Sequence, residues 1–140
     1  KRVKEIRDFI VEREINKEVS FFVNIRANTF TEEMCSLLKD MNTTRVFVGF
    51  ESNSQKILDF YNKRQTRAEN QRVVDLCKQY HIQVIGSFII GAPVETAEDI
   101  EETYDFIYRN AENMGSFTCS YLIPEPGTPV WDYINRSFLL

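Results

Sequence analysis

The stretch "VIGSFIIGAPVETAEDI", residues 84–100, contains the strand-to-helix transition on which the fold depends. Residues 84–90 are almost continuously apolar, which is typical of a strand covered on both faces in a parallel sheet. Gly91 and Pro93 then interrupt the strand, and Thr96 with the acidic residues after it is typical of a helix start. The stretch therefore predicts a strand, a polar turn and a helix that ends near Asn113.

Similar units occur on both sides of this stretch. Helices are indicated by apolar residues three and four positions apart, and strands by short runs rich in β-branched and aromatic residues. The other predicted elements are a helix over 2–14, a strand over 19–25, a helix from Thr29 or Thr31, a strand over 46–50, a helix after 52–54, a helix from the capping box at 66–69, a strand over 117–123 and a short helix from Thr128.

Strands that alternate with helices favour parallel pairing through right-handed crossovers. The sequence thus predicts an α/β fold of one domain over residues 1–140, either half of an eight-unit barrel or an open sheet. Both architectures bind ligands at the carboxyl ends of their strands.

Composition excludes several classes of protein. A chain of 140 residues with 43% hydrophobic residues has room for one core. Its net charge of −4 and the lack of a basic stripe argue against a nucleic-acid partner. No apolar run approaches the roughly 20 residues of a membrane helix, so we expect a cytoplasmic protein.

The cysteines and the histidine point to no catalytic or metal site. Cys35, Cys77 and Cys119 are 42 residues apart each time, too dispersed for a local metal motif, so we interpret them as idle or buried thiols. His81 is the only histidine. A barrel hydrolase or aldolase therefore lacks a convincing pair of nucleophile and base.

Polar residues follow the first two strands. Arg26 offers a planar set of donors that can bind a carboxylate from two sides. Glu51 and Ser52 can bind hydroxyls or an ammonium group. The alternatives are that Arg26 pairs with Glu51, and that Ser52 only caps a helix.

The turn at 91–96 has one residue that a simple turn does not need, Glu95. Gly91 lacks a side chain, so its backbone could lie against a flat ligand, and Gly86 within the strand indicates a bulge or a close approach. An ordinary tight turn is the alternative. The last loop, which includes Pro124, presents mainly carbonyl oxygens that could accept from an amine.

Four blocks, "RVFVGFES", "NKRQT", "GSFIIGAPVET" and "YLIPEPGTPVW", resemble the radical S-adenosylmethionine (radical SAM) enzymes in their order and spacing. The resemblance covers most of residues 19–133. It is closest to the group with coproporphyrinogen-type oxidases, methylthiotransferases and cobalamin-associated iron-sulfur oxidoreductases.

The resemblance implies a partial TIM-like barrel of six βα units, of which this chain supplies the third to sixth. Family members hold a 4Fe-4S cluster through a CxxxCxxC loop and cleave S-adenosylmethionine reductively to start hydrogen abstraction. This sequence has no CxxxCxxC, so we expect it to be inactive alone, with an electron donor serving the parent enzyme. The resemblance leaves open the substrate and the use of cobalamin.

The resemblance also implies which residues contact S-adenosylmethionine. Contacts to its methionyl and ribose parts fall on Arg26, Glu51 and Ser52. Contacts to adenine fall on Gly86, Gly91, Pro93, Glu95, Tyr121 and Pro124. The sequence departs from the family at Val94, where a second glycine is usual, and at Arg26, where some members have a glutamate-containing strand end.

A second hypothesis is a non-catalytic βα module for binding or assembly. Four strands cannot close a barrel, so one sheet edge that a complete barrel would cover should be free to pair. We therefore expect self-association through that edge.

Overall fold

The structure is a computed structural model that describes residues 1–138. Its helices are α1 (Arg2–Glu12), α2 (Ile15–Glu18), η1 (Ala27–Thr29, a 3₁₀ turn), α3 (Glu32–Asp40), α4 (Gln55–Phe60), α5 (Arg67–Gln79), α6 (Ala97–Arg109) and α7 (Pro129–Phe138). Its strands are β1 (Phe21–Ile25), β2 (Thr43–Glu51), β3 (Gln83–Ile90) and β4 (Met114–Tyr121).

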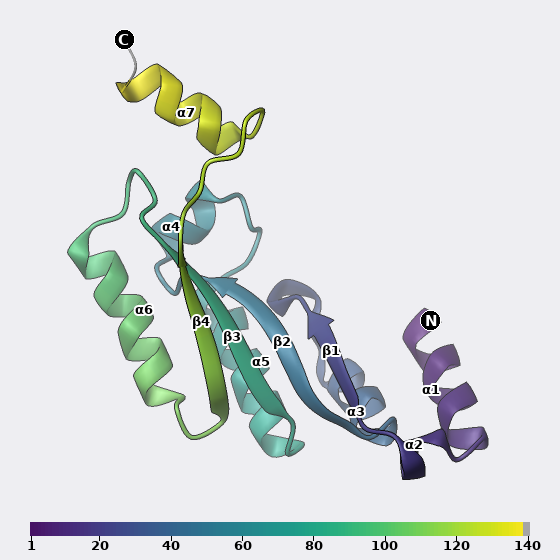
Figure 1. The fold of residues 1–140 in the computed structure, drawn as a ribbon. Coiled ribbons are helices and arrows are strands. Elements are labelled where there is room, and N and C mark those ends of the chain that lie inside the picture. Colours follow the sequence, from purple (N-terminus) through teal and green to yellow (C-terminus); the bar gives the residue numbers. More distant parts are fainter. Residues whose placement is uncertain (139–140) are drawn as a thin grey trace.

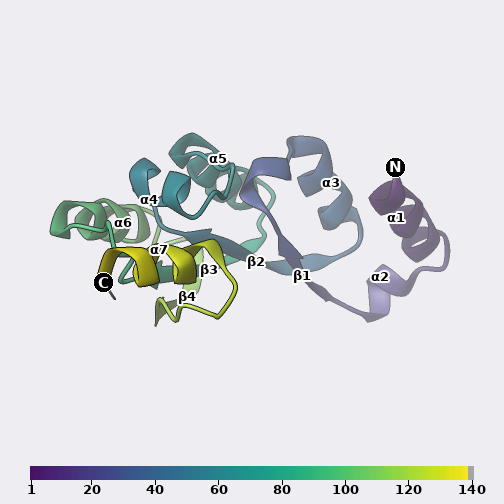
Figure 2. The same ribbon diagram turned by 90° about the horizontal axis from the view of Figure 1, so that it is seen from above.

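The four strands form one sheet in the order β1-β2-β3-β4, and every neighbouring pair is parallel (Figure 1). Figure 2 shows α3, α4, α5 and α6 on one side of this sheet, and Figure 1 shows α7 beyond the carboxyl ends of the strands. The predicted α/β fold with parallel strands is confirmed. The side opposite the helices, called the inner face below, is the concave side of a partial barrel.

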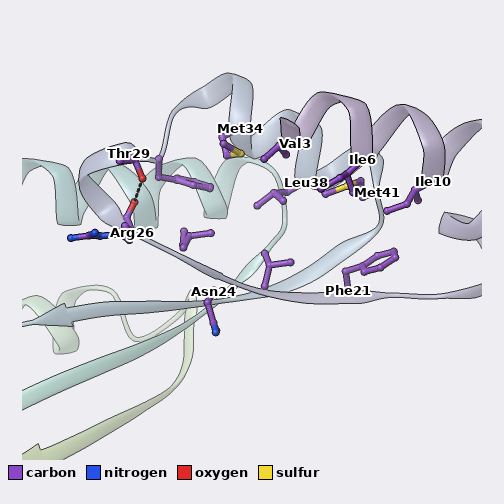
Figure 3. Close-up of a pocket in the computed structure, with 13 residues that line it drawn as sticks. Val3, Ile6, Ile10, Phe21, Asn24, Arg26, Thr29, Met34, Leu38 and Met41 are labelled. Carbon is purple, nitrogen blue, oxygen red and sulfur yellow. Dashed lines mark hydrogen bonds between the residues drawn. The ribbon is translucent and has the colours of Figure 1, made fainter. Parts of the chain in front are cut away.

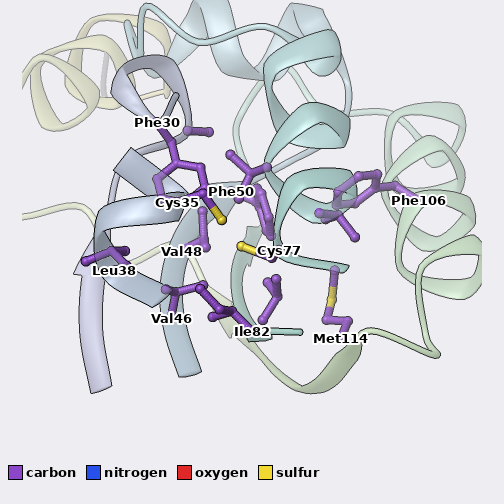
Figure 4. Packing of buried hydrophobic residues seen from close by; sticks show 14 of the residues in the cluster. Phe30, Cys35, Leu38, Val46, Val48, Phe50, Cys77, Ile82, Phe106 and Met114 are labelled. Carbon is purple, nitrogen blue, oxygen red and sulfur yellow. The ribbon is translucent and has the colours of Figure 1, made fainter. Parts of the chain in front are cut away.

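The core lies between the sheet and the helices (Figure 4). Its centre is an aromatic cluster in which the Phe50 ring lies 5.7 Å from Phe88 and 5.3 Å from Phe106. Cys35 and Cys77 are fully buried in this core, which confirms them as buried thiols. Cys119 is exposed on β4.

β3 is covered less completely than its apolar sequence predicted. Val84, Gly86 and Phe88 are buried beneath the helices, whereas Ile85, Ser87 and Ile89 on the inner face are only half-buried. The helices of the described chain pack on one face of this strand, so the expectation of cover on both faces is wrong here.

Several element boundaries also differ from the predictions. α6 ends at Arg109 rather than near Asn113, and its C-cap residue Asn110 donates from its side chain to the Phe106 carbonyl at 2.8 Å. β4 then starts at Met114, earlier than the predicted Phe117, since pairing with β3 does not need an apolar sequence. The predicted first helix, over 2–14, ends earlier, at Glu12, and Glu14, whose φ is 57°, separates it from the short α2.

No helix in residues 1–138 is both long enough and apolar enough to cross a membrane.

Candidate functional site at the carboxyl ends of the strands

The polar residues that follow the four strands lie at one edge of the sheet, the upper edge in Figure 1. This edge is called the rim below, and it is formed by residues 26, 51–54, 91–96 and 121–124. Because all four strands are parallel, their carboxyl ends meet there. The predicted convergence of the strand ends is therefore present.

Glu51 has an unusual backbone conformation at the end of β2. Its φ is 60°, and the N–H of Ser52 donates to the Phe50 carbonyl at 2.8 Å across it. This region is strained for residues other than glycine, and such strain often occurs at functional sites. The Glu51 carboxylate accepts from the ammonium group of Lys63 at 2.6 Å, and both side chains are largely buried.

This ion pair lies on the inner face, above Gly49. A Cβ atom added at Gly49 would lie 2.8 Å from Glu51 Oε1 and 3.8 Å from Lys63 Nζ. The missing side chain therefore leaves room for the pair. The result is a carboxylate and an ammonium group presented together at the concave end of β2.

Lys63 is a site residue that the sequence analysis did not single out. It follows α4, in a loop where Asn62 and Arg64 have φ values of 51° and 50°. Its position in the "NKRQT" block was the available signal. Pairing with Glu51, twelve residues earlier, depends on how this loop folds back over β2.

Arg26 does not pair with Glu51. Glu51 pairs with Lys63 instead, so that predicted alternative is wrong. Arg26 ends β1 at the same edge of the sheet, and its carbonyl accepts from the Thr29 hydroxyl at 3.3 Å. In Figure 3 its guanidinium group extends away from the neighbouring apolar side chains.

The pocket in Figure 3 meets the rim only at Arg26. It has a volume of about 410 Å³ and lies behind β1, between α1 and α3. Its lining is mostly apolar, with Ile10, Phe30 and Leu38 among the buried residues. We interpret it as incomplete packing of α1 against the sheet, because the ends of β2, β3 and β4 do not line it.

Ser52 is part of a buried polar network beneath Glu51. Its hydroxyl lies 3.0 Å from the Thr103 hydroxyl and accepts from the backbone N–H of Ser54 at 3.0 Å. The carbonyl of Ser52 accepts from the Asn70 amide at 3.1 Å. The N-cap of α4 is Ser54, so Ser52 does not cap the helix as the alternative predicted. Ser52 has no exposed surface, so it supports the end of β2 from below and is not accessible to a ligand in this structure.

Asp99 connects this network to the next strand end. One carboxylate oxygen accepts from the Ser54 hydroxyl at 2.6 Å, and the other accepts from Lys56 Nζ at 2.5 Å and the Thr96 backbone at 2.9 Å. Hydrogen bonds from Lys56 and Ser54 hold the pKa of Asp99 well below its usual range. Asp99 and Thr96 also form the capping box that starts α6.

Glu95 stabilises the turn after β3 through hydrogen bonds within that turn. The Glu95 carboxylate accepts from the N–H of Gly91 at 2.5 Å, and its own N–H donates to the Ala92 carbonyl at 2.9 Å. Pro93 occupies the position of this turn that favours proline. Val94 does not have a positive φ, so the turn does not need the glycine that is usual in the family. Gly91 does need its freedom, because its φ is 93°.

The remaining predicted residues are differently placed. Gly86 lies beneath the helices, where an added Cβ would be 2.8 Å from the Phe88 ring and 3.1 Å from Met114 Sδ, so its close approach is to side chains of the core. Tyr121 is 79% exposed at the end of β4, and Pro124 follows in the loop to α7. The predicted contacts of Gly86, Tyr121 and Pro124 with a cofactor stay predictions.

The described residues do not form a metal site. No three of their histidine, cysteine or acidic side chains come together in residues 1–138. The three cysteines are split between the core and the surface of β4. They do not fit an iron-sulfur cluster.

A family model described as "Radical SAM superfamily" matches residues 2–107. The chain belongs to the radical SAM superfamily. The match extends from α1 into α6 and includes the ends of the first three strands.

Curated relatives include an uncharacterised methyltransferase of Pyrococcus horikoshii, which is 34% identical over 123 residues, or 88% of this chain and 26% of the relative. The bacteriochlorophyllide d C-8(2)-methyltransferase of Chlorobaculum tepidum is 26% identical over 142 residues, or 100% of this chain and 30% of the relative. The chain thus spans between a quarter and a third of these two relatives.

Solved structures show the same fold. The radical SAM methyltransferase TsrM from Kitasatospora setae, with cobalamin and a [4Fe-4S] cluster bound, gives a TM-score of 0.81 at 22% identity over 95% of this chain and 25% of TsrM. Archaeal Elp3 from Methanocaldococcus infernus gives a TM-score of 0.76 at 17% identity over 96% of this chain and 35% of Elp3. The sheet and its helices are thus a segment of the TIM-barrel-like radical SAM fold.

Proposed function

We propose that this chain supplies part of the S-adenosylmethionine site of a radical SAM enzyme that cleaves this cofactor reductively and acts on an unidentified substrate. The observation that carries the proposal is the gathering of four strand ends, three of them within the family match, at one rim. The four strands correspond in this proposal to the third to sixth units of the barrel.

Glu51 and Lys63 suit the polar parts of S-adenosylmethionine. Lys63 can bind the methionyl carboxylate, and Glu51 can accept from an amino group or from ribose hydroxyls. Gly91 leaves open space at the next strand end, since an added Cβ would have Leu122 N at 3.9 Å as its nearest neighbour. That space suits a flat adenine ring.

The cluster does not fit the described residues, so we propose that a different part of the parent enzyme holds it and receives electrons from a donor protein. The chain alone would then be inactive. Cobalamin is a candidate second cofactor, because TsrM binds it. The sequence left open an oxidoreductase or a transferase, and the names of these two relatives favour a methyl transfer.

Titration with S-adenosylmethionine tests the proposal directly. We expect amide resonances of residues 51–54 and 91–96 to shift in NMR spectra of the ¹⁵N-labelled chain, since these residues form the rim. Shifts confined to the pocket between α1 and α3, or no shifts at millimolar cofactor, would contradict it.

Replacing Gly49 with alanine should weaken S-adenosylmethionine binding about tenfold, because the new Cβ moves the Glu51 carboxylate out of place. A hydrogen bond between that carboxylate and the cofactor would contribute roughly 1.5–3 kcal/mol to binding. The free energy of unfolding should change by less than about 1 kcal/mol, since the displaced atoms end a flexible side chain. NMR titration and urea unfolding measure the two effects.

Gly115→Ala is the matched control for Gly49→Ala. Its new Cβ would also meet the end of a flexible side chain, Gln83 Nε2 at 1.9 Å, but at the opposite end of the sheet. Equal losses of affinity in the two variants would show that the effect of Gly49→Ala does not come from the Glu51–Lys63 pair.

We also propose self-association. β1 and β4 each pair on one side only, and a mostly apolar groove of about 380 Å³ between β4 and α6 includes the half-exposed Phe117. Light scattering should show a mass that rises with concentration. Phe22→Lys on β1 and Phe117→Lys on β4 should identify the edge used, because an edge lysine opposes pairing. A constant monomer mass would contradict this proposal.

A further inference from the structure

The turn that carries Glu51 is irregular in two ways. The N–H of Ser52 donates to the Phe50 carbonyl at 2.8 Å, so Glu51, with a φ of 60°, is the central residue of a γ-turn of the rarer and more strained form. The pairing of β2 with β3 also shifts register between Gly49 and Glu51. Bulges of this kind redirect a side chain, and a strained residue persists only where its surroundings hold it. The surrounding residues must therefore hold the end of β2 in this shape.

Asn70 is placed to do so. It lies in the first turn of α5 and has no exposed surface. Its Nδ2 donates to the Ser52 carbonyl at 3.1 Å and to Asn53 Oδ1 at 3.3 Å. Ser52 and Asn53 are the two residues that follow Glu51, so both hydrogen bonds fix the chain immediately after the γ-turn.

Gln65 completes this network on the other side of Glu51. Its Nε2 donates to Asn70 Oδ1 at 2.5 Å and, more weakly, to the Phe50 carbonyl at 3.5 Å. Gln65 is buried as well, so both polar atoms of the Asn70 side chain are paired inside the protein. The two amide side chains thus contact the residues before and after Glu51.

We propose that Asn70 is a positioning residue of the cofactor site, which holds the γ-turn and thereby orients the Glu51 carboxylate toward S-adenosylmethionine at the rim. This inference rests on the proposed function. Asn70 is closed to solvent, so it acts through Glu51 and does not touch the cofactor. Without its two hydrogen bonds, Glu51 can relax to a negative φ, and its carboxylate then leaves the place where the cofactor needs it.

A double-mutant cycle in S-adenosylmethionine binding separates this role from a general contribution to the fold. The cycle compares the wild type, Asn70→Ala, Glu51→Gly and the double variant, and glycine is used at 51 because it tolerates the positive φ while removing the carboxylate. We expect each single variant to bind about tenfold more weakly. The double variant should bind as Glu51→Gly does, since Asn70 then has no carboxylate to position. NMR titrations of the ¹⁵N-labelled proteins measure the four dissociation constants.

Hydrogen exchange of the free protein tests the turn itself. The Ser52 N–H should exchange with solvent faster in Asn70→Ala than in the wild type, because the γ-turn opens. Asn113→Ala is the matched control, since Asn113 Nδ2 also donates to α5, to the Val74 carbonyl at 3.3 Å, but at the opposite end of the sheet. It should leave cofactor binding unchanged even if it lowers the melting temperature.

Gln65→Met takes the place of Asn70→Ala in the cycle if the latter does not fold. It keeps both donors of Asn70, so we expect a loss of about threefold, again absent without the Glu51 carboxylate. If the wild type binds S-adenosylmethionine and the Asn70 or Gln65 variant binds it equally well, or if the losses of the single variants multiply in the double variant, the inference fails while the proposed function stands. If the wild type does not bind S-adenosylmethionine, the proposed function fails and the inference with it.

Discussion

Replacing Asp99 with asparagine should lower the free energy of unfolding by about 2–4 kcal/mol at pH 7. Asp99 is only 7% exposed, and its carboxylate accepts hydrogen bonds from Ser54 and from the Thr96 backbone. Its ion pair with Lys56 adds little to this figure, because the Lys56 side chain is half exposed. Most of the lost stability therefore comes from the buried hydrogen bond of the Ser54 hydroxyl and from the cap of α6.

Urea unfolding measures the effect, and Asp105→Asn is the matched control. Asp105 is exposed on the same helix, so this variant should differ from the wild type by less than about 0.5 kcal/mol. Equal stabilities of the Asp99 and Asp105 variants would show that the network does not stabilise the fold.

The stability difference should also depend on pH. Because the folded protein holds the pKa of Asp99 below its usual value of 3.8, the stabilisation is fully present above that value. It is lost as the pH falls further toward the folded pKa. The gap between wild type and Asp99→Asn should therefore narrow between pH 4 and pH 2, and a gap that widens there would contradict this assignment.

Asp99 also holds together two parts of the cofactor site that we propose. It links the turn of residues 51–54, at the end of β2, to the first turn of α6, after β3. We expect Asp99→Asn to weaken S-adenosylmethionine binding although the side chain is not itself part of the contact surface. It acts as a positioning residue, and Asp99→Glu, which keeps the charge, should restore part of the affinity.

Replacing Phe50 with alanine should cost about 3–5 kcal/mol, the usual loss for a buried phenylalanine. Its ring has no exposed surface and packs against Phe88 and Phe106, so truncation leaves a cavity at the centre of the core. Since Phe50 directly precedes Glu51, we also expect the strained turn at the end of β2 to loosen.

Phe22→Ala is the control for this prediction. Phe22 is 53% exposed on β1, so its truncation should cost less than about 1 kcal/mol. Chemical denaturation of the two variants in parallel tests the difference. Similar losses of unfolding free energy would mean that packing in the aromatic cluster does not stabilise the fold more than an exposed ring on β1 does.

The sequence was sufficient for the features that arise from nearby residues. The capping box of Thr66 with Glu69 joins residues three positions apart, so it could be predicted and was found. The predicted helix start at Thr96 was also found, and there Thr96 and Asp99 form a second capping box. The alternation of strands and helices likewise predicted the parallel sheet, and this sheet brings the polar strand ends to one rim.

Only the tertiary structure decided which of those polar residues are buried and which partner each one has. Ser52 is buried because Thr103, 51 residues later, supplies its partner. Lys63 reaches Glu51 because its loop folds over β2, where Gly49 leaves space. Local sequence determines helices, turns and strands, whereas the partner of each rim side chain depends on contacts between distant segments, which form when the helices pack on the sheet.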